Sequence, residues 1–198
     1  MRLLRAAVAM AAMLLAAGCL PVTSKTPVGT TVGLGADEAL TGTWIGKSLD
    51  AEDKSDNHTI YFHFLKGKDG NLMALMVGAA GKNDDDWMAF NLRTATPGKN
   101  RFINAVETFD NNRPAEGPLK DANIPLLYTI KGGKLTLYWL DEDKVKVAIK
   151  AGRIAGTIEP GDFGDVKITA DAAALDAFMA KPEAAALFKV FIVLKKAE

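Results

Sequence analysis

Residues 126–140 read LLYTIKGGKLTLYWL, two short apolar runs on either side of Gly132-Gly133. Adjacent glycines suit the two-residue turn of a β-hairpin, because both central residues of such a turn can adopt positive φ. This stretch therefore predicts two antiparallel strands, over 125–131 and 134–141. Ala151-Gly152 lies between VKVAIK and RIAGTI and predicts a second hairpin of the same kind.

Short strand-like runs separated by turn residues continue in both directions from this hairpin, beginning near Leu40. The cleanest alternation is KVKVAIK at 144–150, which places Val145, Val147 and Ile149 on one face of a strand. One apolar face and one polar face indicate an antiparallel sheet that is buried on one side. The strands expected from these patterns are 40–49, 58–65, 71–79, 86–95, 101–109, 125–131, 134–141, 144–150, 153–159, 164–169 and 188–195.

One helix is predicted late in the chain. Leu175, Phe178 and Met179 recur at helical spacing, and Thr169 can cap this segment at its N-terminus. Pro182 ends or kinks the helix and can start a further turn. The last strand, 188–195, is apolar on both faces, so it must be covered on both sides, and we expect it to close the sheet.

Many short antiparallel strands in sequence favour a mainly β fold, an up-and-down β-barrel, with a two-layer β-sandwich as the alternative. The stretch Leu40-Thr41-Gly42-Thr43-Trp44 resembles the Gly-x-Trp opening of lipocalins. The match covers Gly42 and Trp44, together with the late helix. The resemblance implies that the tryptophan plugs the closed end of the barrel and that the late helix packs outside it.

The N-terminus has the composition of a signal peptide. Arg2 and Arg5 precede an apolar run at 6–17, which is too short for a membrane-spanning helix. Leu15-Ala16-Ala17-Gly18-Cys19 then resembles the lipobox of bacterial lipoproteins, and the alternative is an ordinary secretory signal. The predicted organisation is a signal peptide at 1–18, a lipidated cysteine and flexible tether at 19–37, and a single barrel-like domain at 38–198.

Cys19 is the only cysteine of the chain, so no internal disulfide is possible. The lipobox resemblance implies that its thiol carries a diacylglycerol and that the lipid anchors the protein to a membrane. Leu20 follows it, where an aspartate would resemble the inner-membrane retention signal of enteric lipoproteins. We therefore expect a protein of the outer membrane that faces the periplasm.

Charge and motifs argue against several function classes. The 24 basic and 24 acidic residues cancel, which argues against a nucleic-acid partner. Gly46-Lys47-Ser48 lacks the glycine that a P-loop requires at position 41. His58 and His63 point to opposite faces of one strand, so they cannot share a metal ion without distortion. No catalytic constellation is visible, and we expect neither an enzyme nor a cofactor or metal.

The apolar interior remains as the candidate site, because a small barrel can hold one small ligand or be filled by its own side chains. The leading hypothesis is a lipid-anchored periplasmic protein that binds a small hydrophobic ligand in its barrel. The alternative is a structural or interaction lipoprotein with a filled core, which binds an envelope protein or inhibits an enzyme through the 110–123 loop. The expected ligand-binding residues are Trp44, Phe62, Phe64, Met76, Phe90 and Trp139.

Overall fold

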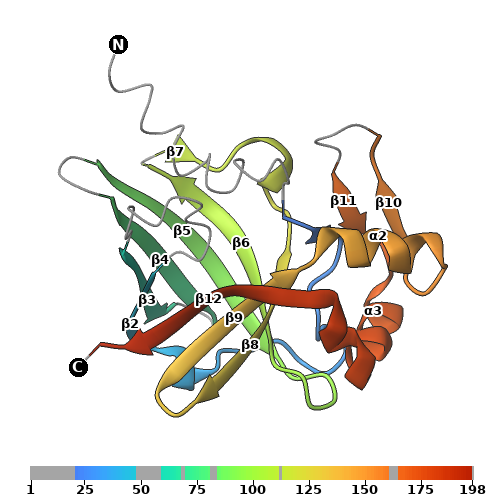
Figure 1. The fold of residues 1–198 in the computed structure, drawn as a ribbon, viewed down its shortest axis with the longest axis horizontal. Helices are drawn as coiled ribbons and strands as arrows, with labels where there is room; N and C mark the ends of the chain where they lie inside the picture. The colour runs from blue at the N-terminus through green and yellow to red at the C-terminus, as the bar shows by residue number, and fades with distance from the viewer. Residues whose placement is uncertain are drawn as a thin grey trace.

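Eight antiparallel strands close into a barrel in the computed structural model of the chain (Figure 1). The structure describes residues 21–47, 59–67, 70–80, 84–111, 113–160 and 165–197. The barrel strands are β2 (Gly42–Lys47), β3 (Thr59–Lys66), β4 (Leu72–Ala80), β5 (Asp84–Ala95), β6 (Phe102–Asp110), β8 (Ile124–Lys131), β9 (Lys134–Leu140) and β12 (Phe188–Lys196). Pairing of β5 with β6 and of β12 with both β9 and β2 closes the ring, so the prediction of a barrel is confirmed and the sandwich is excluded.

The hairpin predicted around Gly132-Gly133 joins β8 to β9. Lys131 pairs with Lys134 across the turn, and Gly132 and Gly133 have φ values of 58° and 71°. Positive φ at both central residues is the geometry of the tightest hairpin turn, which a side chain at either position would strain. The prediction made from the two glycines is therefore confirmed.

The C-terminal strand closes the barrel, as expected. In β12, Leu194 pairs with Gly46 of β2 on one side and with Leu135 of β9 on the other. A Cβ at Gly46 would lie only 2.7 Å from the carbonyl oxygen of Val193, so glycine lets these two strands approach each other. The first and last strands of the barrel thus complete its hydrogen-bonding ring.

The predicted strand at 144–150 is wrong, because these residues form the helix α2 (Glu142–Lys150). Asp141 caps the helix, its side chain accepting a hydrogen bond from the Lys144 backbone N–H at 3.3 Å. Val145 and Ala148, three residues apart, are both fully buried on one face. Alternating lysine and valine fit a strand, but the cap and this burial at helical spacing favour the helix.

The predicted hairpin at Ala151-Gly152 is therefore also wrong, because these residues end α2. The Gly152 N–H bonds to the Ile149 carbonyl and the Arg153 N–H to the Ala148 carbonyl, both at 2.9 Å. Gly152 has φ of 66°. This is the left-handed C-terminal cap that glycine favours.

The strands expected over 153–159 and 164–169 exist in shorter form but lie outside the barrel. They are β10 (Gly156–Ile158) and β11 (Val166–Ile168), which pair antiparallel, while β1 (Thr23–Ser24) pairs parallel to β11. These strands make a separate small sheet beside the barrel (Figure 1).

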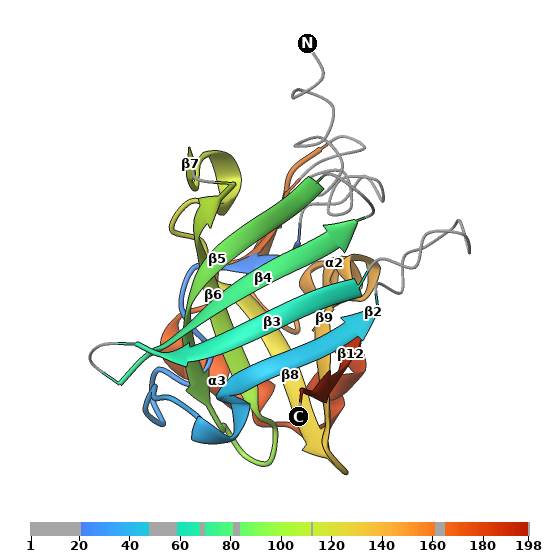
Figure 2. The ribbon, with the colours of Figure 1, turned by 90° about the vertical axis from the view of Figure 1, so that its left-hand side faces the viewer.

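The late helix is confirmed as α3 (Ala172–Met179), followed by the 3₁₀ helix η4 (Pro182–Leu187) and then β12. Its cap is Asp171 and not Thr169, because the Asp171 carboxylate accepts a hydrogen bond from the Ala174 N–H at 2.8 Å. Figure 2 shows β2–β5 in front, with α2 and α3 on the opposite side of the barrel.

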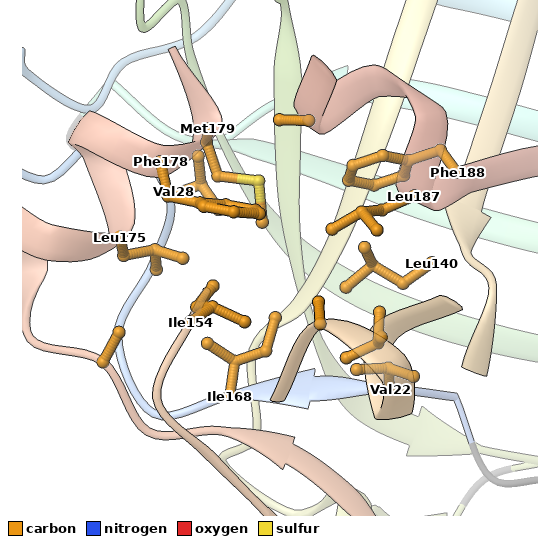
Figure 3. Packing of buried hydrophobic residues seen from close by; sticks show 14 of the residues in the cluster. Val22, Val28, Leu140, Ile154, Ile168, Leu175, Phe178, Met179, Leu187 and Phe188 are labelled. Carbon is orange, nitrogen blue, oxygen red and sulfur yellow. The ribbon is translucent and has the colours of Figure 1, made fainter. Parts of the chain in front are cut away.

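A second apolar core joins the helices and the small sheet to the outside of the barrel (Figure 3). Phe102 and Phe188, whose rings are 5.7 Å apart, belong to barrel strands but pack in this core. Leu175 and Met179 of α3 meet Ile168 of β11 there, all fully buried. The barrel thus buries apolar side chains on both its inner and its outer surface over this region.

The flexible tether expected up to residue 37 is wrong for residues 21–37, which pack against the fold. Val28 is fully buried, and its backbone N–H and carbonyl bond to the Asn104 side chain at 2.7 and 2.8 Å. Gly35 bridges to Thr94 of β5. Polar side chains from distant parts of the sequence hold this segment in place. The pattern of residues 19–37 alone therefore could not predict these contacts.

Candidate functional site

The barrel contains an apolar cavity of about 80 Å³. Because side chains alternate along a strand, most of the lining residues are every second residue of a barrel strand. Two residues outside the barrel strands also line it, namely Pro21 and, from the 3₁₀ helix η3 (Gly117–Leu119), Leu119. The strand residues that line it are Phe62, Phe64, Ala74, Met76, Met88, Phe90, Leu92, Ile103, Ala105, Glu107, Ile124, Leu126, Leu137, Trp139 and Phe191.

The structure brings together five of the six ligand-binding residues expected from the sequence. Phe62 and Phe64 stack with ring centroids 5.9 Å apart, and Trp139 stacks on Phe191 at 4.7 Å. The five that line the cavity are Phe62, Phe64, Met76, Phe90 and Trp139. Trp44, the sixth, is not among the lining residues.

Trp44 lies at the closed end of the barrel. Its side chain is 1% exposed, and its Nε1–H donates to the Leu40 carbonyl at 2.6 Å. Leu40 belongs to the 3₁₀ helix η1 (Glu38–Leu40), which precedes β2, and the Lys196 ammonium lies 5.5 Å from the centre of the indole ring. Trp44 therefore packs beneath the cavity instead of lining it.

A charged cluster of three side chains lies at the same end. The Tyr128 hydroxyl donates to the Asp37 carboxylate at 2.5 Å, and Arg101 forms an ion pair with that carboxylate and covers the Tyr128 ring. Burial alone raises the pKa of Asp37, but hydrogen bonds from Tyr128, Ala39 and Arg101 outweigh it, so the pKa is lowered. Burial and the bond to Asp37 raise the pKa of Tyr128. The cluster holds the N-terminal segment against the barrel.

The opposite end is the mouth of the cavity. Pro21 precedes β1, whose Ser24 N–H bonds to the Asn123 carbonyl at 2.8 Å, just before β8 begins. Leu119 belongs to the connection between β6 and β8. Both residues therefore line the cavity at the end where β6 finishes and β8 starts, and the 110–123 connection covers part of the mouth.

Glu107 is the one titratable residue among those that line the cavity in the described part of the chain. It is 9% exposed, lies near the mouth end of β6, and its carboxylate accepts no hydrogen bond from the described residues. Burial, and then the nearby negative charge of Asp110, raise its pKa. The charged form of Glu107 is therefore unfavourable in the empty barrel.

Trp139 supplies a second polar group at the cavity. Within the described residues its indole Nε1–H is buried and has no hydrogen-bond partner. A buried donor without a partner is uncommon in folded proteins and points to a water or ligand. The cavity wall is thus apolar except for two polar side chains, Glu107 and Trp139.

Sequence reasoning missed Glu107, although a signal was present. Ile103, Ala105 and Glu107 alternate along the strand expected at 101–109, so an inward Ile103 places Glu107 inward as well. Pro21 and Leu119 carry no such signal, because their position depends on how segments outside the barrel fold back over its mouth.

We expect Glu107→Gln to change how stability depends on pH. A carboxyl whose folded-state pKa is raised binds more protons in the folded than in the unfolded state, so the free energy of unfolding falls as pH rises above the ordinary value of 4.5. Asp110, which is paired with exposed Arg113 at 3.8 Å, is the charged neighbour. Urea denaturation from pH 4 to 8 should show this fall in the wild type and not in the variant; parallel curves would contradict it.

The remaining candidates form no second site within the part of the chain that the structure describes. His63 Nδ1 lies 3.0 Å from the Thr43 hydroxyl, whereas His58 and Cys19 lie outside the described residues. Among the described residues no cluster of three His, Cys, Asp or Glu side chains could hold a metal ion. In the same part of the chain, no helix is long and apolar enough to cross a membrane.

Comparison with known proteins identified no relative. A scan against protein-family models found no match to this chain, and searches of curated proteins and of solved structures found none either.

Proposed function

We propose that this chain is a lipocalin-like binding protein of the bacterial cell envelope and that its barrel holds a small apolar ligand. The observation that supports the proposal is the cavity, whose lining is apolar except for Glu107 and the Trp139 indole N–H. Pockets of this composition bind ligands by apolar contact and orient them through a few polar groups. A barrel that served only as a structural support would gain stability from a filled interior.

The size of the cavity restricts the ligand. A volume of about 80 Å³ is far below the roughly 300 Å³ at which pockets for drug-sized ligands begin. A single short alkyl chain fits such a space, and a fused ring system does not. Met76 and Met88 lie in the wall, and their flexible side chains can adapt to chains of different shape.

The proposed location follows from the resemblance of residues 15–19 to a lipobox. A lipid on Cys19 would tether the protein to the membrane, and Pro21, two residues further on, lines the mouth of the cavity. Two residues span at most about 7 Å. An anchor at Cys19 therefore keeps the mouth close to the membrane surface, where apolar molecules concentrate. We propose the periplasmic face of the outer membrane as the site of action.

Filling the cavity tests the proposed function. Ala105 is 4% exposed and lines the cavity, so Ala105→Leu places three extra carbon atoms in it. We expect the variant to bind a neutral probe, 1-hexanol, at least about tenfold more weakly, because the space for the alkyl chain is taken. Chemical-shift titration by NMR measures the affinity.

Ala177→Leu is the matched control, because it makes the same change on an exposed position of α3. It should bind 1-hexanol as the wild type does. Equal affinity of Ala105→Leu and Ala177→Leu, or no binding of 1-hexanol by the wild type, would contradict the proposed function.

A further inference from the structure

A carboxyl group in an otherwise apolar cavity restricts the chemistry of the ligand. Glu107 is 9% exposed and, among the described residues, has no hydrogen-bond donor. Partial removal of an ionised carboxylate from water is costly when it has no partner, and no described residue donates a hydrogen bond to Glu107. The missing partner is a hydrogen-bond donor, and a positively charged donor compensates most because its bond is charge-assisted.

The charges around the mouth also favour a positively charged ligand group. Asp110 lies close enough to Glu107 to disfavour its ionisation, which adds negative potential at this end of the cavity. The Arg113 guanidinium of β7 (Arg113–Pro114) is exposed and lies 3.8 Å from the Asp110 carboxylate. No other titratable side chain of the described residues lines the cavity. An anionic head group would therefore be repelled, and a cationic one attracted.

The position of Glu107 sets the orientation of a ligand. Glu107 lies three residues before the end of β6 at the mouth, whereas Phe64, Leu92 and Leu137 line the cavity toward its closed end. A molecule with one polar end and one apolar end can enter with its chain first and leave its head beside Glu107. Pro21 and Leu119 then flank the head at the entrance.

We propose that the ligand is a short-chain primary amine, whose ammonium group pairs with the Glu107 carboxylate while its alkyl chain fills the cavity. This inference rests on the proposed function and names its ligand class. The observation that supports it is the 9% exposed Glu107 side chain at the mouth of an apolar cavity, whose carboxylate accepts no hydrogen bond from the described residues.

Three probes of equal chain length test the inference: n-hexylamine, 1-hexanol and hexanoate, each titrated at pH 7.5 by NMR. We expect the wild type to bind hexylamine about tenfold more tightly than 1-hexanol, as a charge-assisted hydrogen bond predicts. Hexanoate should bind more weakly than either. Glu107→Gln, which keeps the size of the side chain, should bind hexylamine and 1-hexanol with equal affinity.

Asp110→Asn is the control variant, because it removes the neighbouring charge and leaves Glu107 in place. It should retain most of the preference for the amine. Equal binding of hexylamine and 1-hexanol by the wild type, or a preference that survives in Glu107→Gln, would overturn the amine inference and leave the apolar binding function standing. Failure of all three probes, 1-hexanol included, would instead overturn the proposed function.

Discussion

Trp44→Ala should lower the free energy of unfolding by about 4 kcal/mol, the range measured for truncating a fully buried aromatic side chain. The indole is 1% exposed and fills the closed end of the barrel beneath the cavity. Its removal also leaves the Leu40 carbonyl without the donor that Nε1 supplies at 2.6 Å. Urea denaturation followed by circular dichroism measures the loss.

Trp87→Ala is the matched control for this experiment. Trp87 lies on β5 with only part of its side chain buried, so the same truncation should cost less than half as much. A Trp44→Ala variant no less stable than Trp87→Ala would show that the closed end is not packed as described.

Asp176→Ala should release the N-terminal segment and cost about 3 kcal/mol or more. The Asp176 side chain is 4% exposed and accepts hydrogen bonds from the Gly29 N–H at 2.5 Å, the Thr31 N–H at 2.7 Å and the Thr31 hydroxyl at 2.6 Å. Alanine leaves two backbone donors and a hydroxyl without their acceptor. Native-state hydrogen exchange should show the amides of Gly29 and Thr31 losing protection.

Two further variants make the Asp176 result specific. Asp143→Ala removes an exposed carboxylate in the first turn of α2 and should leave the exchange of Gly29 and Thr31 unchanged. Asp176→Asn keeps one acceptor oxygen and should lose less protection than Asp176→Ala. Unchanged protection of both amides in Asp176→Ala would contradict the docking of this segment.

The barrel could be predicted from the sequence because its strands have recognisable local sequence patterns. The glycine pair at 132–133 specifies a hairpin, and alternating apolar residues on each side specify the face that is buried. Such patterns need only neighbouring residues, so nearly every barrel strand was predictable within a few positions. Closure by β12 followed from its two apolar faces.

The errors have two physical origins: a helix cap that lies just outside an alternating stretch, and contacts between segments that lie far apart in the chain. The alternation at 144–150 fits a strand, but the Asp141 cap and the burial of Val145 and Ala148 at helical spacing favour a helix. Residues 21–37 look like a linker because they have few apolar residues, yet Asn104 and Asp176 hold them through backbone hydrogen bonds. Neither Asn104 nor Asp176 can be identified as a partner from residues 21–37 alone.

The candidate site was predictable in its apolar part and not in its polar part. Five aromatic or methionine residues on barrel strands face one cavity because alternation puts them there. Trp44, on the same kind of strand, lies below the cavity, where its indole N–H donates to the Leu40 carbonyl. The resemblance to the Gly-x-Trp opening of lipocalins implies this position, whereas the alternation along the strand does not. Glu107 required a search for polar residues on an inward face.

Native mass spectrometry of the gently purified protein tests the central claim most directly. If the barrel binds a small apolar ligand, the spectrum should contain a stoichiometric adduct that is lost on denaturation and is absent from Ala105→Leu. The claim would be contradicted if the spectrum showed no adduct and none formed when 1-hexanol or n-hexylamine was added. That result would favour an interaction protein.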